Sequence, residues 1–305
     1  MAAPDSRLHG YGDPGYADSL KEWGHPVKLA SSDGWLLERP IAGSPHHDAM
    51  GCYPLFSCGN WDGLADDIAQ GRSRWVSVSI VTDPFGCDNP EILERAFDRV
   101  IAFKEHFVAS LTQSVATVAS PHHARRARRG LRNVVVDVAV NALACLDEWV
   151  ALYDVLSARH AITGLRRFSR AAFADQLAIP GMQVLRARCA SQTVGLQLYL
   201  QRDEVVYYHL AAYDERGYES SAAYALHWTA HEYFRTQASW LSLGAGAGST
   251  ESSNSLADFK HGWSTGTRQV YYCSRILQPD RYAELRAATA NVSDGYFPAY
   301  RSGEF

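Results

Sequence analysis

The chain has 305 residues, of which 47% are hydrophobic and 20% charged, and its formal net charge is −4. These values are typical of a globular protein with a large core, and they exclude a strongly basic protein, so any affinity for nucleic acid must come from a local patch. No apolar run approaches the ~20 residues of a membrane span. No signal peptide opens the chain and the six cysteines form no Cys-x-x-Cys pair, so we expect a cytoplasmic protein with reduced thiols and no membrane partner.

The first 118 residues predict an arm followed by an α/β domain. Residues 1–26 are polar and lack periodicity, so we expect a loosely ordered arm. In residues 27–118, apolar patterns and capping residues predict a strand at Trp35–Pro40, a loop at Gly43–Gly51, a helix at Asp62–Gln70, a strand at Arg74–Thr82, a helix at Pro90–Phe97 and an extended segment at Val100–Leu111.

Residues 119–305 predict a second domain that is richer in strands. It begins with a helix from Ser120, a strand at Val134–Val140, and helices at Leu143–Ser157 and Ser169–Leu177. Strands follow at Met182–Cys189, Val194–Leu200 and Glu204–Tyr213, then a long helix near Tyr218–Arg235 and a short strand at Trp240–Leu243. The last elements are a Gly/Ser loop at Gly244–Ser255, a strand at Arg268–Leu277 and a helix at Pro279–Thr289.

Four segments of this second domain carry a resemblance to a known family: Thr193-Val-Gly-Leu-Gln-Leu-Tyr-Leu, Val205-Val-Tyr-Tyr-His-Leu-Ala-Ala-Tyr, Trp240-Leu-Ser-Leu-Gly-Ala-Gly and Asp258-Phe-Lys-His-Gly-Trp. In this order they resemble the acyl-binding half of the GNAT acyltransferase superfamily in its FemAB-like form. The resemblance implies an α/β (mixed α+β) fold with a GNAT-like central mixed sheet and flanking helices. It leaves room for two GNAT-like halves, of which residues 27–118 would be the degenerate one.

The same resemblance implies an N-acyltransferase without a tightly bound cofactor. Its co-substrate would be an acyl-CoA, and its acceptor an amine of a small molecule or of an envelope or natural-product precursor. Aminoacyl-tRNA is the alternative donor, with tRNA as a partner. A non-catalytic GNAT-like binding module is the alternative to an enzyme, and a homodimer is left open.

In this family the acyl group binds where two parallel strands diverge and expose backbone groups; the resemblance implies that these are Val205–Tyr213 and Trp240–Leu243. Lys260 would stabilise the oxyanion or a leaving-group phosphate, and His209 would be the general base beside Tyr213, the third catalytic candidate. The acyl and acceptor cleft would be lined by Tyr208, Gly244 and Phe259. Plainer interpretations stay open, because a mid-strand histidine is more often a core residue and Lys260 would also suit a surface position.

The loop after Tyr213 lacks the phosphate-binding pattern of acetyl-CoA-using enzymes. Those enzymes have Arg/Gln-x-x-Gly-x-Gly/Ala, whereas this chain has Asp214-Glu-Arg-Gly-Tyr-Glu-Ser-Ser-Ala. The residues left as candidates for donor binding are Arg216, Gly217 and Ser220. Two acids in the loop, Glu215 and Glu219, would repel a pyrophosphate, so this segment does not establish acetyl-CoA as the donor.

A dense run of arginines is a second candidate for anion binding. On a helix, one face would carry His122, Arg125, Arg126 and Arg129, flanked by Arg128 and Arg132. Arginine matches phosphate bidentately, and no acid lies within one turn, so the run would suit tRNA, the phosphates of coenzyme A or a phosphorylated acceptor. The alternative is a solvated helix face.

The histidine pairs do not predict a metal site. His227 and His231 have i, i+4 spacing, but Glu232 follows them, so the order is not that of the zinc-protease motif. His46-His47-Asp48 lies in a predicted loop. We therefore expect no metal.

Overall fold

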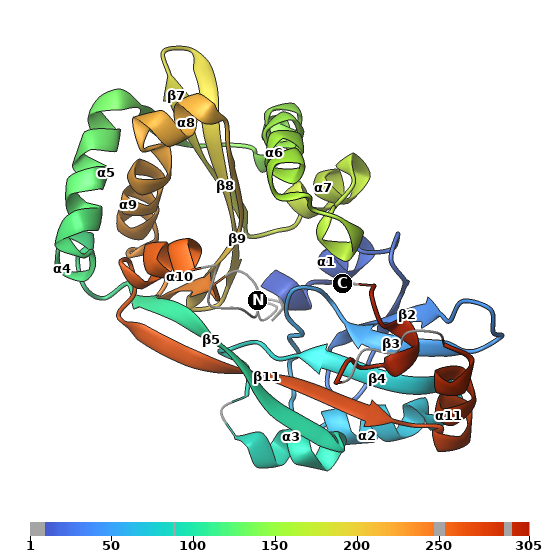
Figure 1. The fold of residues 1–305 in the computed structure, drawn as a ribbon. Helices are drawn as coiled ribbons and strands as arrows, with labels where there is room; N and C mark the ends of the chain where they lie inside the picture. Colours follow the sequence, from blue (N-terminus) through green and yellow to red (C-terminus); the bar gives the residue numbers. More distant parts are fainter. Residues whose placement is uncertain (1–9, 88, 247–253, 290–294, 305) are drawn as a thin grey trace, which may run out of the picture. The chain divides into compact units, whose positions relative to one another are not determined.

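The computed structural model describes residues 10–87, 89–246, 254–289 and 295–304 (Figure 1). The chain forms two compact units that are discontinuous in sequence. Unit 1 comprises Met1–Lys104, Thr163–Arg166 and Gln269–Phe305, and unit 2 comprises Glu105–Ile162 and Arg167–Arg268. This grouping differs from the predicted consecutive domains 27–118 and 119–305, because the last strand of the chain pairs with a strand from the N-terminal residues.

In unit 1 the strands follow the order β1 (His25–Lys28), β2 (Trp35–Pro40), β3 (His47–Gly51), β4 (Trp75–Val81) and β11 (Gly266–Ile276), of which β11 begins in unit 2. β3 and β4 are parallel, and the other neighbours are antiparallel. The helices are α1 (Pro14–Asp18), α2 (Leu64–Gln70), α3 (Pro90–Ala96) and α11 (Pro279–Ala288). The core includes Leu36, Phe56, Leu64, Ile68 and Ile80, each at most 2% exposed.

Two N-terminal predictions are wrong. For residues 10–26 a loosely ordered arm was expected, but α1 is capped by Asp13, and Tyr16, Ala17 and Leu20 are fully buried. A helix of five residues is too short to show periodicity, and here burial of an aromatic ring holds it in place. The second half of the predicted loop Gly43–Gly51 is strand β3, whose burial pattern does not alternate.

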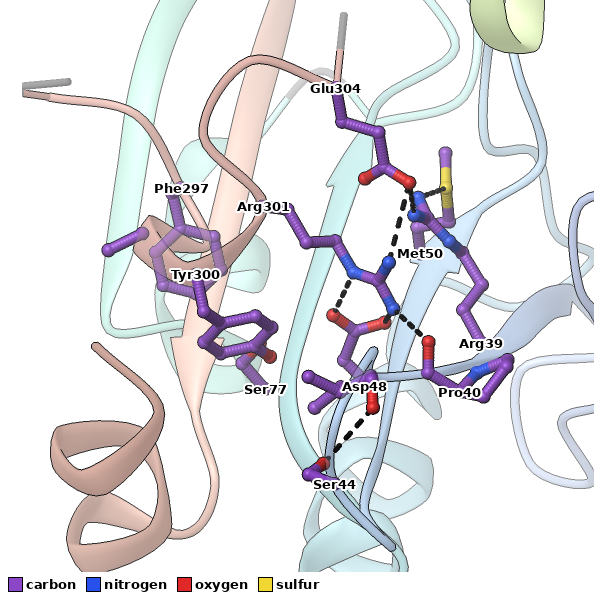
Figure 2. A network of polar contacts seen from close by, with 12 residues as sticks. Arg39, Pro40, Ser44, Asp48, Met50, Ser77, Phe297, Tyr300, Arg301 and Glu304 are labelled. Carbon is purple, nitrogen blue, oxygen red and sulfur yellow. Dashed lines mark hydrogen bonds and ion pairs between the residues drawn. The ribbon is translucent and has the colours of Figure 1, made fainter. Parts of the chain in front are cut away.

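The C-terminal residues of unit 1 are held by a network of ion pairs (Figure 2). The guanidinium of Arg301 binds the buried carboxylate of Asp48 through two nitrogens, at 2.6 and 2.9 Å, and donates to the carbonyl of Pro40 at 2.8 Å. Glu304 pairs with Arg301 and with Arg39 of β2. Asp48 is therefore a structural partner of arginine.

In unit 2 the strands follow the order β5 (Arg99–Ser110), β10 (Trp240–Gly244), β9 (Val205–Tyr213), β8 (Gln192–Arg202), β7 (Met182–Cys189) and β6 (Val135–Val138), and β5 begins in unit 1. β9 and β10 are parallel, and the other neighbours are antiparallel. The sheet is therefore mixed. The helices are α4 (Val115–Val118), α5 (Pro121–Asn133), α6 (Leu146–His160), α7 (Arg170–Leu177), α8 (Glu215–Ser220), α9 (Ala222–Phe234) and α10 (Asn254–His261).

Helices cover both faces of strands β7–β9. α5 and α9 lie on one face, and α6 and α7 lie on the other (Figure 1). The α9 face holds the larger core cluster, which includes Tyr199, Val206, Leu226, Phe234 and Leu241. Among the described residues, no helix combines the length and the apolar character needed to cross a bilayer.

The predicted helix Tyr218–Arg235 is two helices. Ser221 separates α8 from α9 and has φ 63°, in the left-handed region that L-residues rarely adopt. Ser221 also lies against α5, where a Cβ on Gly130 would meet its carbonyl oxygen at 2.6 Å. Glycine at 130 thus lets α5 and α9 approach closely.

Candidate active site

Strands β9 and β10 pair only where they begin. The register joins residues 205–207 to residues 240–242 and then ends. β9 continues to Tyr213 paired with β8, whereas β10 ends at Gly244. Along the described strands, the edge of β9 that faces away from β8 therefore has no neighbour after Tyr207. Peptide groups on such an edge are available to bond an extended acyl chain.

A β-bulge in β9 decides which of its side chains face α9. In the pairing of β8 with β9, Gln197 lies opposite Ala211 and Tyr199 lies opposite Tyr208. Two steps along β8 therefore correspond to three steps along β9, and the extra residue is His209. Because the bulge shifts the alternation by one residue, Tyr208 shares the face of Ala211. The ring of Tyr208 accordingly packs against His227 of α9, with 4.6 Å between the ring centroids.

His209 lies away from this face. Its Nε2 is 3.2 Å from Oε1 of Gln176 in α7, and its ring lies near Phe168. Burial lowers the pKa of His209 to about 3. A neutral imidazole that contacts Gln176 on the α7 side does not suit the predicted general base. The bulge is the physical reason for this correction, because it puts Tyr208 on the α9 face and leaves His209 on the α7 side.

Lys260, on α10, lies close to the end of β10. Its Nζ donates to the carbonyl of Ala245 at 2.6 Å and lies 6.0 Å from the ring centroid of Tyr208. Gly244 has φ +75°, and a Cβ there would be 3.1 Å from Nζ, so only glycine fits without strain. The structure thus brings the predicted residues Lys260, Tyr208 and Gly244 together, where the two strands diverge.

An aromatic cluster surrounds the turn of α10 that carries Lys260. Phe259, the fourth predicted residue here, lies 5.0 Å from the ring of His227, which is stacked on Trp263 at 5.7 Å. Burial, together with the charge of Lys260, lowers the pKa of His227 to about 3. An uncharged His227 therefore leaves Lys260 the cation of this cluster.

His123 ties α5 to the same turn of α10. Its Nε2 is 3.0 Å from the carbonyl oxygen of Phe259, and its Nδ1 is 2.8 Å from Oγ of Ser120. Its ring covers Gly262, where a Cβ would lie 2.1 Å from the imidazole. Burial lowers the pKa of His123. These contacts fix the backbone next to Lys260.

Tyr213 ends β9 on the α9 face and is 8% exposed. Its hydroxyl accepts a hydrogen bond from Nε2 of Gln197 at 2.7 Å. Burial raises the pKa of Tyr213 to about 12, so its hydroxyl is protonated at neutral pH. Tyr213 can therefore donate a proton but cannot act as a base in its resting state.

The segment expected to hold a pyrophosphate is the short capped helix α8. Oδ1 of Asp214 accepts from the amide of Gly217 at 2.7 Å. Gly217 is buried, and Oγ of Ser220 donates to its carbonyl at 3.2 Å. Arg216 is exposed and donates to a side-chain amide of β8. The carboxylate of Asp214 thus accepts the Gly217 N–H that a phosphate would need. Of the three residues predicted to bind the donor, only Arg216 faces solvent.

Helix α5 presents an exposed row of arginines: Arg125, Arg128, Arg129 and Arg132. No carboxylate pairs with any of these four in the part of the chain that the structure describes. The predicted face is wrong for Arg126, which is half-buried with its guanidinium 5.1 Å from the ring centroid of Tyr224. Arg126 turns inward because the docking stripe of α5 runs through Ala127 and Gly130.

The described residues hold no group of three or more His, Cys, Asp or Glu that could bind a metal ion.

Comparisons with known proteins agree with this geometry. Residues 121–260 match the family model described as an acetyltransferase (GNAT) domain. Residues 121–260 are therefore similar to a GNAT-like acetyltransferase domain. The matched residues run from the start of α5 to Lys260, so this GNAT domain contains the diverging strands. No curated protein sequence matches the chain significantly.

Solved structures show the same fold over nearly the whole chain. The crystal structure of FemX has a TM-score of 0.68 at 10% identity, covering 89% of this chain and 93% of FemX. The C-terminal domain of a putative lysylphosphatidylglycerol synthetase from Agrobacterium fabrum gives 0.61 at 12% identity, with 88% and 92% covered. L-PGS from Bacillus licheniformis gives 0.57 at 13% identity, with 90% and 94% covered. The predicted GNAT-like mixed sheet with flanking helices is confirmed.

Four residues of this GNAT site escaped sequence reasoning: His123, Gln197, His227 as a partner of Lys260, and Trp263. A signal existed for Gln197, a polar residue inside an otherwise apolar strand. For His123 and Trp263 there was none, because their contacts join helices that are distant in sequence.

Proposed function

We propose that this acyltransferase moves an acyl group from an activated donor to an amine. The observation that carries the proposal is the early end of the β9–β10 pairing, with Lys260 beside it. The acyl chain would extend along β9 after Tyr207 and bond to its open peptide groups. Its carbonyl oxygen would then lie near Nζ of Lys260, where a cation stabilises the negative charge that develops as the amine attacks.

The local environment favours Lys260 in this role. Its ammonium donates to the carbonyl of Ala245 and lies near the face of Tyr208, two neutral groups that do not cancel its charge. Gly244 keeps the space next to Nζ clear of side-chain atoms. We infer that a substrate oxygen fills this space during the reaction.

The donor has two candidates, an acyl-CoA thioester and an aminoacyl-tRNA. GNAT acetyltransferases generally use acyl-CoA, which supports the first. Two observations support the second: Asp214 occupies the amide of Gly217, and α5 carries an exposed row of arginines suited to a polyanion. One protein of similar fold is named a putative lysylphosphatidylglycerol synthetase, and the product in that name contains an aminoacyl group.

The acceptor that we propose is an amine of a small molecule or of an envelope or natural-product precursor. A cytoplasmic location and a homodimer stay predictions.

The decisive experiment is a transfer assay with both donors. The purified chain is mixed with a panel of primary amines and either acetyl-CoA or a mixture of aminoacyl-tRNAs, and products are identified by mass. Acylated product above the enzyme-free level, lost in Lys260→Met, supports the proposal. A product that forms equally well with Lys260→Met would show that transfer does not use this site.

Binding separates the two donors independently of the acceptor. A ligand at 100 times its Kd raises the free energy of unfolding by about 2.7 kcal/mol, which a thermal shift detects. A shift with bulk tRNA that disappears between low and moderate salt would favour aminoacyl-tRNA. A shift with coenzyme A alone would favour the thioester and overturn the reasoning from Asp214.

A further inference from the structure

A buried glutamine, Gln197, lies behind the hydroxyl of Tyr213. None of its surface is exposed. Its Nε2 donates to the Tyr213 hydroxyl at 2.7 Å, and its Oε1 accepts from the hydroxyl of Tyr199 at 2.6 Å. The register of β8 and β9 places these three side chains on the α9 face of the sheet, with Tyr208 opposite Tyr199.

The hydrogen bonds of this network run in one direction. An amide nitrogen only donates and an amide oxygen only accepts, so the order is from Tyr199 through Gln197 to Tyr213. A side-chain contact also joins Tyr208 and Tyr213, and burial raises the pKa of both. The Tyr213 oxygen accepts the bond from Gln197, so this bond does not use the hydrogen of Tyr213.

We propose that Gln197 is a positioning residue, which directs the hydroxyl hydrogen of Tyr213 out of the core and toward the leaving group of a donor bound along β9. This inference rests on the proposed acyl transfer. The amine nitrogen forms a bond to the acyl carbon, and the bond from that carbon to sulfur or oxygen breaks. The electron pair of the broken bond stays on the leaving atom, which takes the proton of Tyr213. The proton lost by the amine then restores the Tyr213 hydroxyl, so the step is balanced.

The network also suits the phenolate that exists between these two proton transfers. The Gln197 amide already points at the Tyr213 oxygen, so negative charge there meets an aligned donor without reorganisation. Tyr199 is needed because it holds the Gln197 oxygen. Without that bond the amide is free to rotate and to accept from Tyr213, which would turn the hydrogen inward.

Leaving groups of different basicity test this role. The substrates are acetyl-pantetheine, whose thiolate needs a proton, and S-(4-nitrophenyl) thioacetate, whose thiolate does not. Hydroxylamine is the acceptor, and enzyme-free rates are subtracted. The variants are Gln197→Glu, whose carboxylate can only accept, Tyr199→Phe, and Tyr213→Phe. Gln201→Glu is the matched control on the same strand, since Gln201 is half-buried but bonds to loop carbonyls and Gln183.

We expect Gln197→Glu and Tyr199→Phe to lower kcat with acetyl-pantetheine about 10- to 100-fold, within the range of general acid catalysis, with KM unchanged. With the nitrophenyl ester the loss should be below about twofold. Tyr213→Phe should show the larger loss and the same rescue, and Gln201→Glu should match the wild type.

Equal losses with both esters would overturn the positioning role while leaving acyl transfer intact. If Gln197→Glu does not fold, Tyr199→Phe decides alone, because it removes one hydroxyl and keeps the ring. A wild-type rate no higher than the enzyme-free rate with either ester would refute the proposed transfer itself, and this inference with it.

Discussion

Removing the ammonium of Lys260 is the sharpest test of the candidate site. Lys260→Met keeps the apolar stem and deletes the charge. In the structure Nζ donates a charge-assisted hydrogen bond of 2.6 Å to the carbonyl of Ala245 and lies 6.0 Å from the Tyr208 ring centroid. The hydrogen bond contributes about 1.5–3 kcal/mol to stability and the ring contact about 0.5–1 kcal/mol. The loss of stability should therefore stay within about 2–4 kcal/mol, and the variant should fold.

The loss of catalysis should be much larger than this change in stability suggests. A group that stabilises the oxyanion contributes about 10²–10³ in kcat, and because it acts only in the transition state, KM should change little. The assay is the transfer reaction with saturating donor, run well below the thermal midpoint of the variant. Lys28→Met is the control, since Lys28 is an exposed lysine paired with Asp33. A folded Lys260→Met with kcat within about threefold of the wild type would refute the assignment.

Three further predictions follow from the described contacts. Arg301→Met leaves the buried carboxylate of Asp48 without its bidentate partner, so the free energy of unfolding should fall by about 3–5 kcal/mol, measured by thermal or denaturant unfolding; no change would contradict the role of the network in Figure 2. His227 has a folded pKa of about 3, below its unfolded value, so the unfolded state binds the extra proton. The free energy of unfolding should therefore fall as the pH is lowered from about 6.5 to 3, by up to about 1.4 kcal/mol per pH unit. His227→Phe should reduce this slope, whereas His160→Asn, at an exposed position, should not. Replacing Arg125, Arg128, Arg129 and Arg132 together by Gln should leave the thermal midpoint unchanged. The slope of log K for tRNA binding against log salt should fall by about 3, since each of four phosphate contacts contributes about 0.7–0.9. An unchanged slope would exclude this row as the phosphate contact.

The sequence predicted the regular elements of unit 2 well because their patterns are local. Strand β7 (Met182–Cys189) was predicted with its observed bounds, and β8, β9 and β10 within two residues at each end. Their apolar runs are bounded by turn residues, and this signal needs no knowledge of the rest of the fold. The placement of Lys260 beside Gly244 came from the family resemblance.

The failures concern features that only packing decides. Nothing in a nine-residue strand shows that one residue is inserted at His209, yet this insertion exchanges His209 and Tyr208 between the faces of the sheet. Ser221 is not a residue that ordinarily marks a left-handed break, and the break is stabilised by the close approach of α5. The return of β11 to β4 is a pairing between residues about 190 positions apart, which local pattern reasoning does not detect.

Alignment of the acyl group and recognition of its carrier are separate tasks in the candidate site. In the proposed reaction the open edge of β9 and the cation of Lys260 align the acyl group, and neither belongs to α8. Recognition of the carrier cannot use the amide of Gly217, because the carboxylate of Asp214 is bonded to it and would repel a phosphate at that place. We therefore expect carrier recognition to come from side chains elsewhere, and the exposed arginines of α5 lie within the residues that match the GNAT domain. Such a row would add more binding affinity for tRNA, which has many phosphates, than for coenzyme A, which has three. This difference is the physical reason to test both donors.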